Sequence, residues 1–380
     1  MLTQQGCRAR RERLWGALSE PIEWALIADP RHVHYFSNFW INPLSFSAGE
    51  RGFLLLERKG HATLIGDNVA LRSAAGEPFV DEVLEGKWYD HRHSVVNRDA
   101  LLLATLNRAK DQVASGKGLF ENSWFPRAAS QFPDQNLDED LGSVIRSLRR
   151  AKEADEISLL QRCLKAAEAG HARALQVVRP GVSELDVYRE VQSASMEAAE
   201  RPLLVYGDFR AATPGQPKVG GLPTGYELQD GDLFILDFSV VMDGYRSDTT
   251  NTIHVGEHPR ESQSDMFEAC RRALEKGEVV LRPGALARHV YEVVSSELKK
   301  AGHGALRHHA GHGLGLAHPE PPILVPESED ELVVGDVVTL EPGLYVEGIG
   351  GIRLEHNYLI TAESSMRLSQ HPLSLKEAHS

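Results

Sequence analysis

Apolar segments in the C-terminal half of the chain carry isolated acidic residues, a pattern that polar loops do not show. The stretch GDLFILDFSVVMDGYRSDTTNT at 231–252 has the character of a buried strand that breaks at Asp243-Gly244 and resumes as a second strand. Asp-Gly between two such runs is a strong hairpin signal. A two-residue turn at this point pairs Met242 with Tyr245 and thereby sets the register of the hairpin.

This register places two acidic side chains on one face of the predicted hairpin. Counting outward from the turn puts Asp237 opposite Thr250, with Asp248 diagonal to it on the same face. Diagonal neighbours lie about 7–8 Å apart, within reach of two converging carboxylates. Carboxylates that point into an apolar sheet cost several kcal/mol each unless a partner neutralises them. A pair of cations is therefore expected at this hairpin.

A second segment repeats the arrangement. Residues 337–341 form a predicted strand that ends at a Pro-Gly pair, and residues 352–355 form a returning strand, with Glu341 and Glu355 inside apolar flanks. Between the two hairpins lies HHAGHGLGLAHPEPP (308–322), whose glycines allow close backbone approach and whose histidines offer nitrogen ligands. The candidate metal ligands, in chain order, are Asp237, Asp248, His312, Glu341 and Glu355.

Helical segments of the C-terminal half also occur twice. Arg-Pro-Gly at 179–181 and again at 282–284 follows a predicted helix and precedes Val-Tyr at the same offset. The segments upstream, at 164–178 and 267–281, share length and apolar phase. Such a repeat predicts a duplicated unit with pseudo-twofold symmetry, in which each half supplies a hairpin with two acids.

The N-terminal part has a different pattern. Short apolar runs alternate with helical stretches up to about residue 145, and GFLLLE (52–57) and ATLIG (62–66) are candidates for an antiparallel hairpin. A charged segment at 147–156 then opens a long amphipathic helix. We therefore predict a small α/β domain at 1–145 and a second domain at 146–380.

Composition narrows the classes of function. The 380 residues exceed one ordinary domain, and 42% hydrophobic with 25% charged residues is typical of a globular protein. A net charge of −13 argues against nucleic acid or an anionic membrane as the main partner. Three cysteines without CxxC spacing favour neither a disulfide framework nor a thiolate metal site. Because an apolar run of membrane-spanning length is lacking, a cytoplasmic location is expected.

Four spaced motifs resemble one family. DFS followed after eight residues by SDTTNT, then GHGLG, TLEPGLY and GGIRLE are similar to the pita-bread metallopeptidases, the group of methionine aminopeptidase, aminopeptidase P and prolidase. ADPRHVHYFSNFW (28–40) is similar to the smaller domain of aminopeptidase P, prolidase and creatinase. The resemblance implies an α+β fold, with a creatinase-like α/β domain before a duplicated pita-bread catalytic domain.

The resemblance also implies a dinuclear metal site and an activity. Asp237 and Asp248 would hold one divalent ion and His312 and Glu341 the other, with Asp248 and Glu355 bridging. Mn, Co, Zn and Fe all suit these ligands. A metal-bound hydroxide would attack the amide while Glu341 shuttles the proton. The implied enzyme is a homodimeric metallo-exopeptidase of small peptides, either an Xaa-Pro dipeptidase or an Xaa-Pro aminopeptidase.

Further side chains in the motifs are expected at the substrate. The resemblance places His308 there as a catalytic or binding residue and Arg353 as a binding residue. His318 is a candidate catalytic histidine, although it lies one position before the usual place, which is Pro319 here. Loop or core histidines are the alternative for His308, His309 and His318.

One departure from the family keeps other functions open. The loop at 205–226 lacks the histidine that relatives carry in a PHG sequence. This motivates a second interpretation, a hydrolase or lyase of a small non-peptide metabolite with a C–N bond. A third is a catalytically silent binding module, which the intact set of ligands disfavours.

Overall fold

The computed structural model describes residues 1–19, 21–45, 51–92, 97–110, 113, 116–121 and 140–376. The chain divides into two units, Met1–Arg149 and Arg150–Ser380. The limit predicted after residue 145 lies inside helix α5 (Leu141–Leu148), which belongs as a whole to the first unit.

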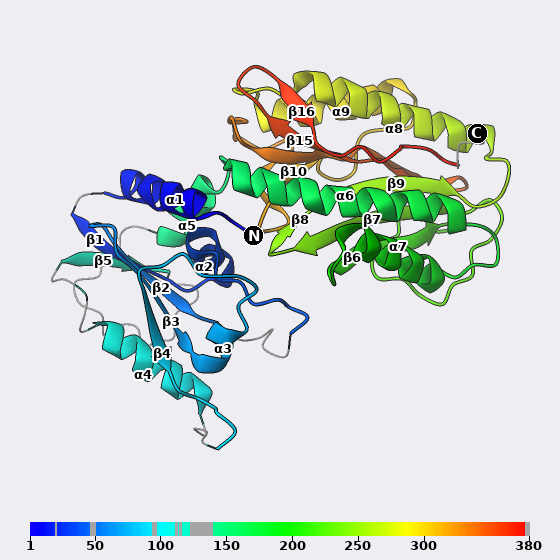
Figure 1. The fold of residues 1–380 in the computed structure, drawn as a ribbon. Coiled ribbons are helices and arrows are strands. Elements are labelled where there is room, and N and C mark those ends of the chain that lie inside the picture. The colour runs from blue at the N-terminus through cyan, green and yellow to red at the C-terminus, as the bar shows by residue number, and fades with distance from the viewer. Residues whose placement is uncertain are drawn as a thin grey trace. The chain divides into compact units, whose positions relative to one another are not determined.

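The first unit is built on one mixed sheet with the strand order β4-β3-β2-β1-β5 (Figure 1). The predicted hairpin is confirmed, because β2 and β3 are antiparallel with Phe53 opposite Ile65. The outer pairs β3–β4 and β1–β5 are parallel. The elements are α1 (Gln4–Ala17), β1 (Ile22–Ile27), α2 (Pro30–Ser37), β2 (Phe53–Glu57), β3 (Ala62–Asp67), α3 (Asn68–Arg72), β4 (Glu82–Gly86), α4 (Arg98–Lys110), β5 (Lys117–Phe120) and α5.

The second unit contains two helix pairs, as the repeat predicts. They are α6 (Ala154–Val177) with α7 (Glu184–Ala199), and α8 (Glu261–Val280) with α9 (Ala287–Lys300). Gly181 and Gly284 follow the first helix of each pair with φ of 83° and 79°, a conformation that glycine adopts without strain. Gly181 N donates to Leu228 O at 2.9 Å, and Gly284 N donates to Leu332 O at 2.8 Å. These matched turns indicate two copies of one structural unit.

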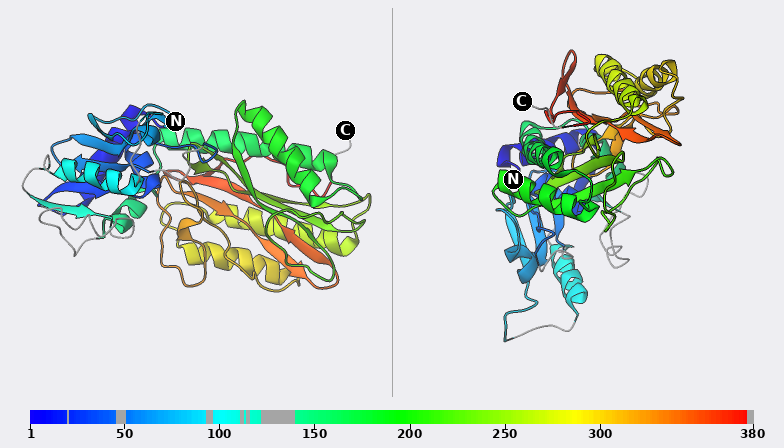
Figure 2. Two further views of the ribbon diagram at one scale, coloured as in Figure 1. Left: turned by 90° about the horizontal axis from the view of Figure 1, so that it is seen from below. Right: turned by 90° about the vertical axis from the view of Figure 1, so that its right-hand side faces the viewer.

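Strands fill the space between the two helix pairs (Figure 2). The first half has β6 (Leu204–Ala212), β7 (Leu233–Met242), β8 (Tyr245–Arg246) and β9 (Thr249–His254) in one sheet. The second half has β10 (His312–Gly313), β11 (Glu320–Ile323), β12 (Val337–Leu340), β15 (His356–Ile360) and β16 (Ser365–Arg367) in another, and β13 (Gly343–Val346) with β14 (Gly350–Arg353) as a separate pair. Each half has its own apolar core between its helices and its strands. The predicted pita-bread fold is thus confirmed.

The first predicted hairpin has the register that its turn indicates. Met242 pairs with Tyr245, and Asp237 lies opposite Thr250. The turn residues Asp243 and Gly244 have φ of 49° and 82°, as a two-residue turn that matches the twist of the strands requires. The Asp-Gly pair therefore determines which side chains face the same side as Asp237.

Strand β9 connects the two halves of the duplicated unit. Thr250 and Glu355 form an antiparallel bridge in which Glu355 N donates to Thr250 O at 3.0 Å. Asp248 N donates to Asn357 Oδ1 at 3.3 Å, and the amide of Asn357 donates back to the carbonyl of Asp248. These bonds hold the acidic segment of the first hairpin against that of the second.

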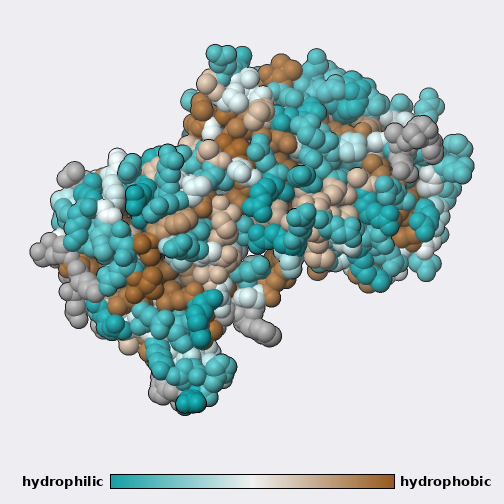
Figure 3. Space-filling view, viewed as in Figure 1, coloured by the Kyte–Doolittle hydropathy of each residue, from teal (hydrophilic) through white to brown (hydrophobic). Residues whose placement is uncertain are grey.

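The visible surface carries both hydrophilic and hydrophobic areas, and brown, hydrophobic side chains gather on part of the first unit (Figure 3). Hydrophilic side chains cover most of the second unit on the face shown in Figure 3. Within the described residues, the structure holds no helix whose length and apolar character would suffice to cross a membrane. The expected cytoplasmic location and homodimer stay predictions.

Candidate metal centre

The five side chains selected from the sequence converge. Asp237, Asp248 and Glu355 form one group whose oxygens lie within 4.8 Å of one another, and His312, Glu341 and Glu355 form a second under the same limit. Because Glu355 belongs to both groups, they adjoin. The donors of one group are all oxygens, whereas the other includes an imidazole.

Both acids of the second hairpin lie where its strands are interrupted. Glu341 follows β12, and Glu355 lies between β14 and β15. The pairs Leu340 with His356 and Gly343 with Arg353 share one register, so Glu341 and Glu355 stand opposite each other at the break.

The first of these strands ends just before the Pro-Gly pair, as predicted, but the returning strand has another partner. A new strand, β13, begins at Gly343, and residues 352–353 pair with β13 and not with β12. Pro342 has no N–H to donate, so the ladder stops at that residue and resumes after it. The break leaves the Glu341 side chain outside the regular pairing.

Two glycines bring neighbouring strands unusually close to the site. A Cβ on Gly207 would lie 2.1 Å from Asp237 O, and one on Gly311 would lie 2.1 Å from Thr339 O. Both have strongly positive φ, 151° and 155°. They place the residues that follow them, Asp208 and His312, beside the acidic strands at matching positions of the two halves.

Crowded carboxylates make the metal-free site electrostatically unfavourable. Burial and the charges of Asp248, Glu341 and Asp237 raise the pKa of Glu355 well above its usual range. Burial raises the pKa of Asp237 to about 7, although Arg353 opposes the shift. Thr250 Oγ1 donates to Glu355 Oε2 at 2.6 Å, whereas Glu355 Oε1 is buried without a hydrogen-bond partner among the described residues. A buried, unpartnered carboxylate oxygen beside other carboxylates fits a cation.

His312 is oriented as a ligand. Its Nδ1 lies 2.9 Å from Gly313 O, so the proton belongs there and Nε2 is free to bind. Nε2 lies 3.4 Å from Asp248 Oδ2 and 3.6 Å from Glu341 Oε1. Burial opposes protonation, but these acids raise the pKa of His312 to about 9. The protonated ring carries a second proton on Nε2, and a metal bound at Nε2 would take the place of this second proton.

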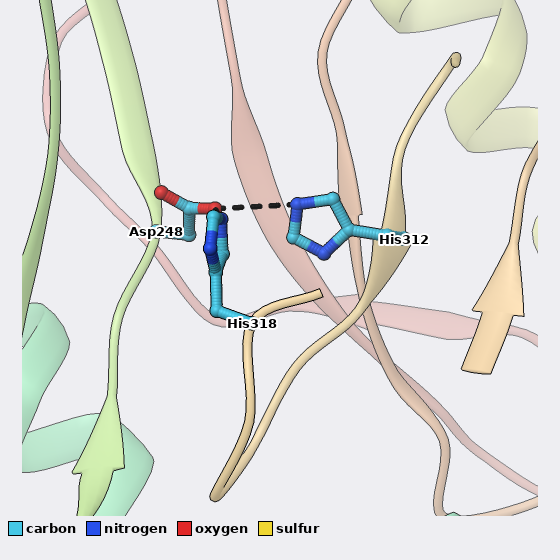
Figure 4. Close-up of side chains that lie close together, drawn as sticks. All are labelled: Asp248, His312 and His318. Atoms are coloured by element: carbon cyan, nitrogen blue, oxygen red, sulfur yellow. Dashed lines mark ion pairs between the residues drawn. The ribbon is translucent and has the colours of Figure 1, made fainter. Parts of the chain in front are cut away.

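His318, expected at the substrate, lies against a candidate metal ligand. Its Nε2 is 2.6 Å from Asp248 Oδ2, and its side chain is 32% exposed. Figure 4 shows the rings of His318 and His312 directed at the same carboxylate from different sides. Burial would raise the pKa of Asp248, but hydrogen bonds with the two histidines lower it below the usual range.

Arg353 contacts acids of the site as well as a phenol. Its Nη2 donates to Asp208 Oδ2 at 2.8 Å and also to Asp237 Oδ2, while Nη1 donates to Tyr345 OH at 3.0 Å. Burial opposes its charge, but Asp237 and its neighbours raise the pKa of Arg353 well above its usual value. In this position Arg353 holds Asp237 in place.

His308 and its neighbour His309 line a cavity that the candidate ligands Asp237, Asp248, His312 and Glu341 also line. His308 Nε2 lies 3.3 Å from Tyr345 OH, and burial lowers the pKa of His308 to about 4, which keeps its imidazole neutral. His309 Nε2 lies 2.9 Å from Glu341 Oε1. Burial would raise the pKa of Glu341, but the hydrogen bond from His309 and the charge of His312 lower it. Glu341 is therefore ionised.

Sequence reasoning missed the roles of three side chains here. His309 had only the loop or core interpretation, and its contact with Glu341 depends on the chain path between distant segments. Tyr345 lies four residues after Glu341, but the interruption of the strand at Pro342 means that alternation along the strand does not relate the two side chains. The pairing of Asp208 with Arg353 was not predicted.

The donor set is suited to two divalent cations. Asp237, Asp248, Glu341 and Glu355 would together neutralise two ions of charge +2, and His312 adds a nitrogen donor. Clusters of this composition polarise a carbonyl and lower the pKa of bound water when the metals are present. The surrounding groups then serve to hold protons and to orient a substrate.

Metal binding is expected to strengthen as the pH rises from about 6 to about 8. In the metal-free protein a proton occupies Asp237 below its pKa of about 7 and His312 below its pKa of about 9, and both protons must leave when metal binds. Calorimetric titration with Mn²⁺ in buffers of different ionisation enthalpy measures both the affinity and the protons released. Affinity that does not change over this pH range would contradict the assignment of these two ligands.

The chain matches known families over most of its length. Residues 158–362 match metallopeptidase family M24, and residues 10–151 match the creatinase/prolidase N-terminal domain. It is 27% identical over 371 residues to the Xaa-Pro dipeptidase of Pyrococcus furiosus, which covers 96% of this chain and 98% of that protein. Over 232 residues it is 31% identical to the Xaa-Pro dipeptidase of Pyrococcus horikoshii, covering 60% of this chain and 64% of that protein.

Solved structures show the same fold. The Xaa-Pro dipeptidase from Bacillus anthracis matches with a TM-score of 0.79 at 25% identity, covering 97% of this chain and 99% of that one. The X-Pro aminopeptidase from Thermotoga maritima matches with a TM-score of 0.78 at 19% identity, covering 99% of each chain. The second likeness concerns the fold alone. Together the matches confirm the family resemblance and both predicted parts of the fold.

Proposed function

We propose that this chain, which belongs to metallopeptidase family M24, is a metal-dependent exopeptidase that hydrolyses the Xaa-Pro bond of dipeptides. The observation that carries the proposal is the convergence of Asp237, Asp248, His312, Glu341 and Glu355, of which all but the fully buried Glu355 line one cavity. The relatives named Xaa-Pro dipeptidase support the type of bond.

Glu341 is the proton carrier in this proposal. Two divalent ions, when bound, supply Lewis acidity and activate the attacking water. Glu341 Oε1 accepts a proton from that water and returns it to the nitrogen of the leaving proline, which departs as a neutral amine. Because His309 Nε2 lies 2.9 Å from Glu341 Oε1, it holds this oxygen in one orientation.

Neutral and cationic side chains beside the candidate ligands orient the substrate. Neutral His308 carries its proton on Nδ1, which donates to His309 O at 2.7 Å, so its Nε2 can only accept. Tyr345 OH, 3.3 Å from that Nε2, is therefore the group that can donate a hydrogen bond to the substrate carbonyl. Arg353 is paired with Asp208 and Asp237 and therefore acts through these side chains.

The cavity favours a short substrate with a free carboxylate. It has a volume of about 290 Å³ and is lined by four of the five candidate ligands, by His308, His309 and His318, and by Lys218. Lys218 Nζ lies 5.6 Å from the centre of the Tyr345 ring, and this lysine has no carboxylate partner among the residues that the structure describes. Two bound divalent ions would balance the four carboxylates of the candidate ligands, and Arg353 balances Asp208. The charge of Lys218 is then left over as one positive charge beside the cavity. A dipeptide carries its carboxylate one residue from the scissile bond and can meet that charge.

Replacing Lys218 by Met is expected to raise KM for an Xaa-Pro dipeptide about 3- to 5-fold with little change in kcat, because the ion pair that is lost lies at an exposed lysine. The amide of the same dipeptide, which lacks the carboxylate, should lose no efficiency. Lys276, on the outer side of α8, serves as a matched Lys→Met control. Equal effects of Lys218→Met on acid and amide would rule out carboxylate recognition by Lys218.

The type of reaction is tested with metal-loaded protein on three substrate classes. Xaa-Pro dipeptides, longer peptides that begin Xaa-Pro, and small non-peptide amides are compared by kcat/KM. We expect the dipeptides to be hydrolysed most efficiently. Turnover of the non-peptide amides alone would favour the second interpretation, which the histidine missing from the loop at 205–226 motivates. Absence of Xaa-Pro hydrolysis with metal bound would contradict the proposed function.

A further inference from the structure

The loop between β10 and β11 brings a second histidine to the metal centre. His318 Nε2 lies 2.6 Å from Asp248 Oδ2, closer than His312 Nε2 at 3.4 Å. Donor atoms of all three residues lie within 4.8 Å of one another. The two rings are nearly perpendicular, with an interplanar angle of 84° and centroids 4.7 Å apart, and so approach the carboxylate from different directions (Figure 4).

The separations of the two nitrogens from the carboxylate oxygen are close to those of donors around one ion. Metal bonds to imidazole nitrogen and carboxylate oxygen are about 2.0–2.2 Å long, so donors on one ion lie about 3 Å apart when adjacent and about 4 Å apart when opposite. His312 Nε2, at 3.4 Å from the Asp248 oxygen, lies within this range, whereas His318 Nε2, at 2.6 Å, is closer than the range and makes a hydrogen bond in the metal-free site. A small outward shift of His318, which lies in a partly exposed loop, would complete the geometry.

The geometry points to His318 as a ligand of the same cation that His312 binds, in addition to the five ligands that the family resemblance supplies. The two metal positions then differ in chemistry. One has two imidazoles beside Asp248, whereas the other has only the oxygens of Asp237, Asp248 and Glu355.

Unequal donors imply unequal metal preference. Imidazole ligands favour zinc, cobalt and nickel, whereas oxygen-only sites suit manganese and magnesium. A second imidazole at one position therefore makes that position select zinc or cobalt over manganese, and a protein with one metal of each kind is expected. This inference depends on metal binding and not on which bond is hydrolysed.

The test is a titration of metal-free full-length protein with Co²⁺, followed by visible absorption and by calorimetry. Wild type should bind one equivalent more tightly than the next, with a spectrum typical of nitrogen ligation. His318→Gln is expected to weaken the tighter equivalent by about 100-fold, the upper range for losing a group that merely supports a ligand, and to shift its spectrum. Mn²⁺ binding at the looser position should change little.

Two further variants complete the design. His258→Gln removes a histidine whose side chain is 92% exposed and should leave both equivalents unchanged. The double variant His318→Val, Pro319→His keeps an imidazole in the loop but moves it to the position usual in the family, and it should lose the tight equivalent as His318→Gln does.

Unchanged Co²⁺ affinity and spectrum in His318→Gln would overturn the inference, and a raised KM for the dipeptide in that variant would then assign His318 to the substrate. Absence of Co²⁺ binding in wild type would overturn it as well and would remove the whole metal centre. Tight Co²⁺ binding without Xaa-Pro hydrolysis would leave the ligand assignment intact and reject only the proposed activity.

Discussion

Glu341→Gln is expected to lower kcat for an Xaa-Pro dipeptide by about 1,000-fold or more, because loss of a general acid–base costs 10²–10⁴-fold and this residue is also a candidate ligand. Glutamine keeps the shape of the side chain but cannot accept the proton of the attacking water. Its amide also competes poorly for a cation. The measurement is kcat and KM at saturating metal, with metal content determined on the same sample.

A matched control separates chemistry from folding. Glu347 lies exposed near the tip of the same hairpin, and Glu347→Gln should retain full activity. If Glu341→Gln kept more than about a tenth of the wild-type kcat with metal bound, the proton would have another carrier. His309 would then be the first group to test, since its Nε2 contacts the same oxygen.

Glu355→Gln is expected to remove most of the stabilisation that metal gives to the protein. A ligand at 1,000 times its Kd stabilises the folded state by about 4 kcal/mol, and each of two ions contributes in this way. Glu355 belongs to both candidate groups, so its loss weakens both positions. Without metal the variant should melt no lower than wild type, because the raised pKa of Glu355, caused by burial and by neighbouring acids, shows that its charge is unfavourable there.

Thermal unfolding in the presence of EDTA and of Mn²⁺ measures this difference. Wild type should gain a large increase in Tm from Mn²⁺, whereas Glu355→Gln should gain little. Glu363→Gln, at an exposed position a few residues along the chain, should behave as wild type. A Glu355→Gln protein that is stabilised by Mn²⁺ as strongly as wild type would exclude Glu355 as a bridging ligand.

Local chemistry explains why the sequence predicted the first hairpin so closely. Asp243-Gly244 permits positive φ at both turn residues, and that turn alone sets the register. Every partner further along follows by counting, including Thr250 opposite Asp237. The repeat of Arg-Pro-Gly similarly gave the duplicated helix pairs, because Pro and Gly end helices by local rules.

Features that depend on contacts between distant segments were not predictable in this way. The second hairpin breaks at Glu341 and Glu355, and the pairing that resumes on each side depends on the hydrogen bond from Glu355 to Thr250 of the other half. The role of Arg353 depends on Asp208, which the close approach at Gly207 brings beside it. The spacing of hydrophobic and polar residues along the sequence carries no information on such contacts.

His318 lies between these two cases. The sequence showed that this histidine is displaced by one position and predicted a catalytic role for it. A shift of one residue in an irregular loop changes the direction of a side chain in a way that no simple period describes. The structure resolves the direction and places the imidazole against Asp248.

Metal content per chain tests the central claim most directly. Metal-free protein is titrated with Mn²⁺, and bound metal is measured together with hydrolysis of an Xaa-Pro dipeptide. Two ions per chain, with activity that reaches its plateau as the second position fills, are expected, and Asp248→Asn should reduce binding at both positions. Activity without bound metal, or binding that Asp248→Asn leaves unchanged, would contradict a two-metal centre at these carboxylates.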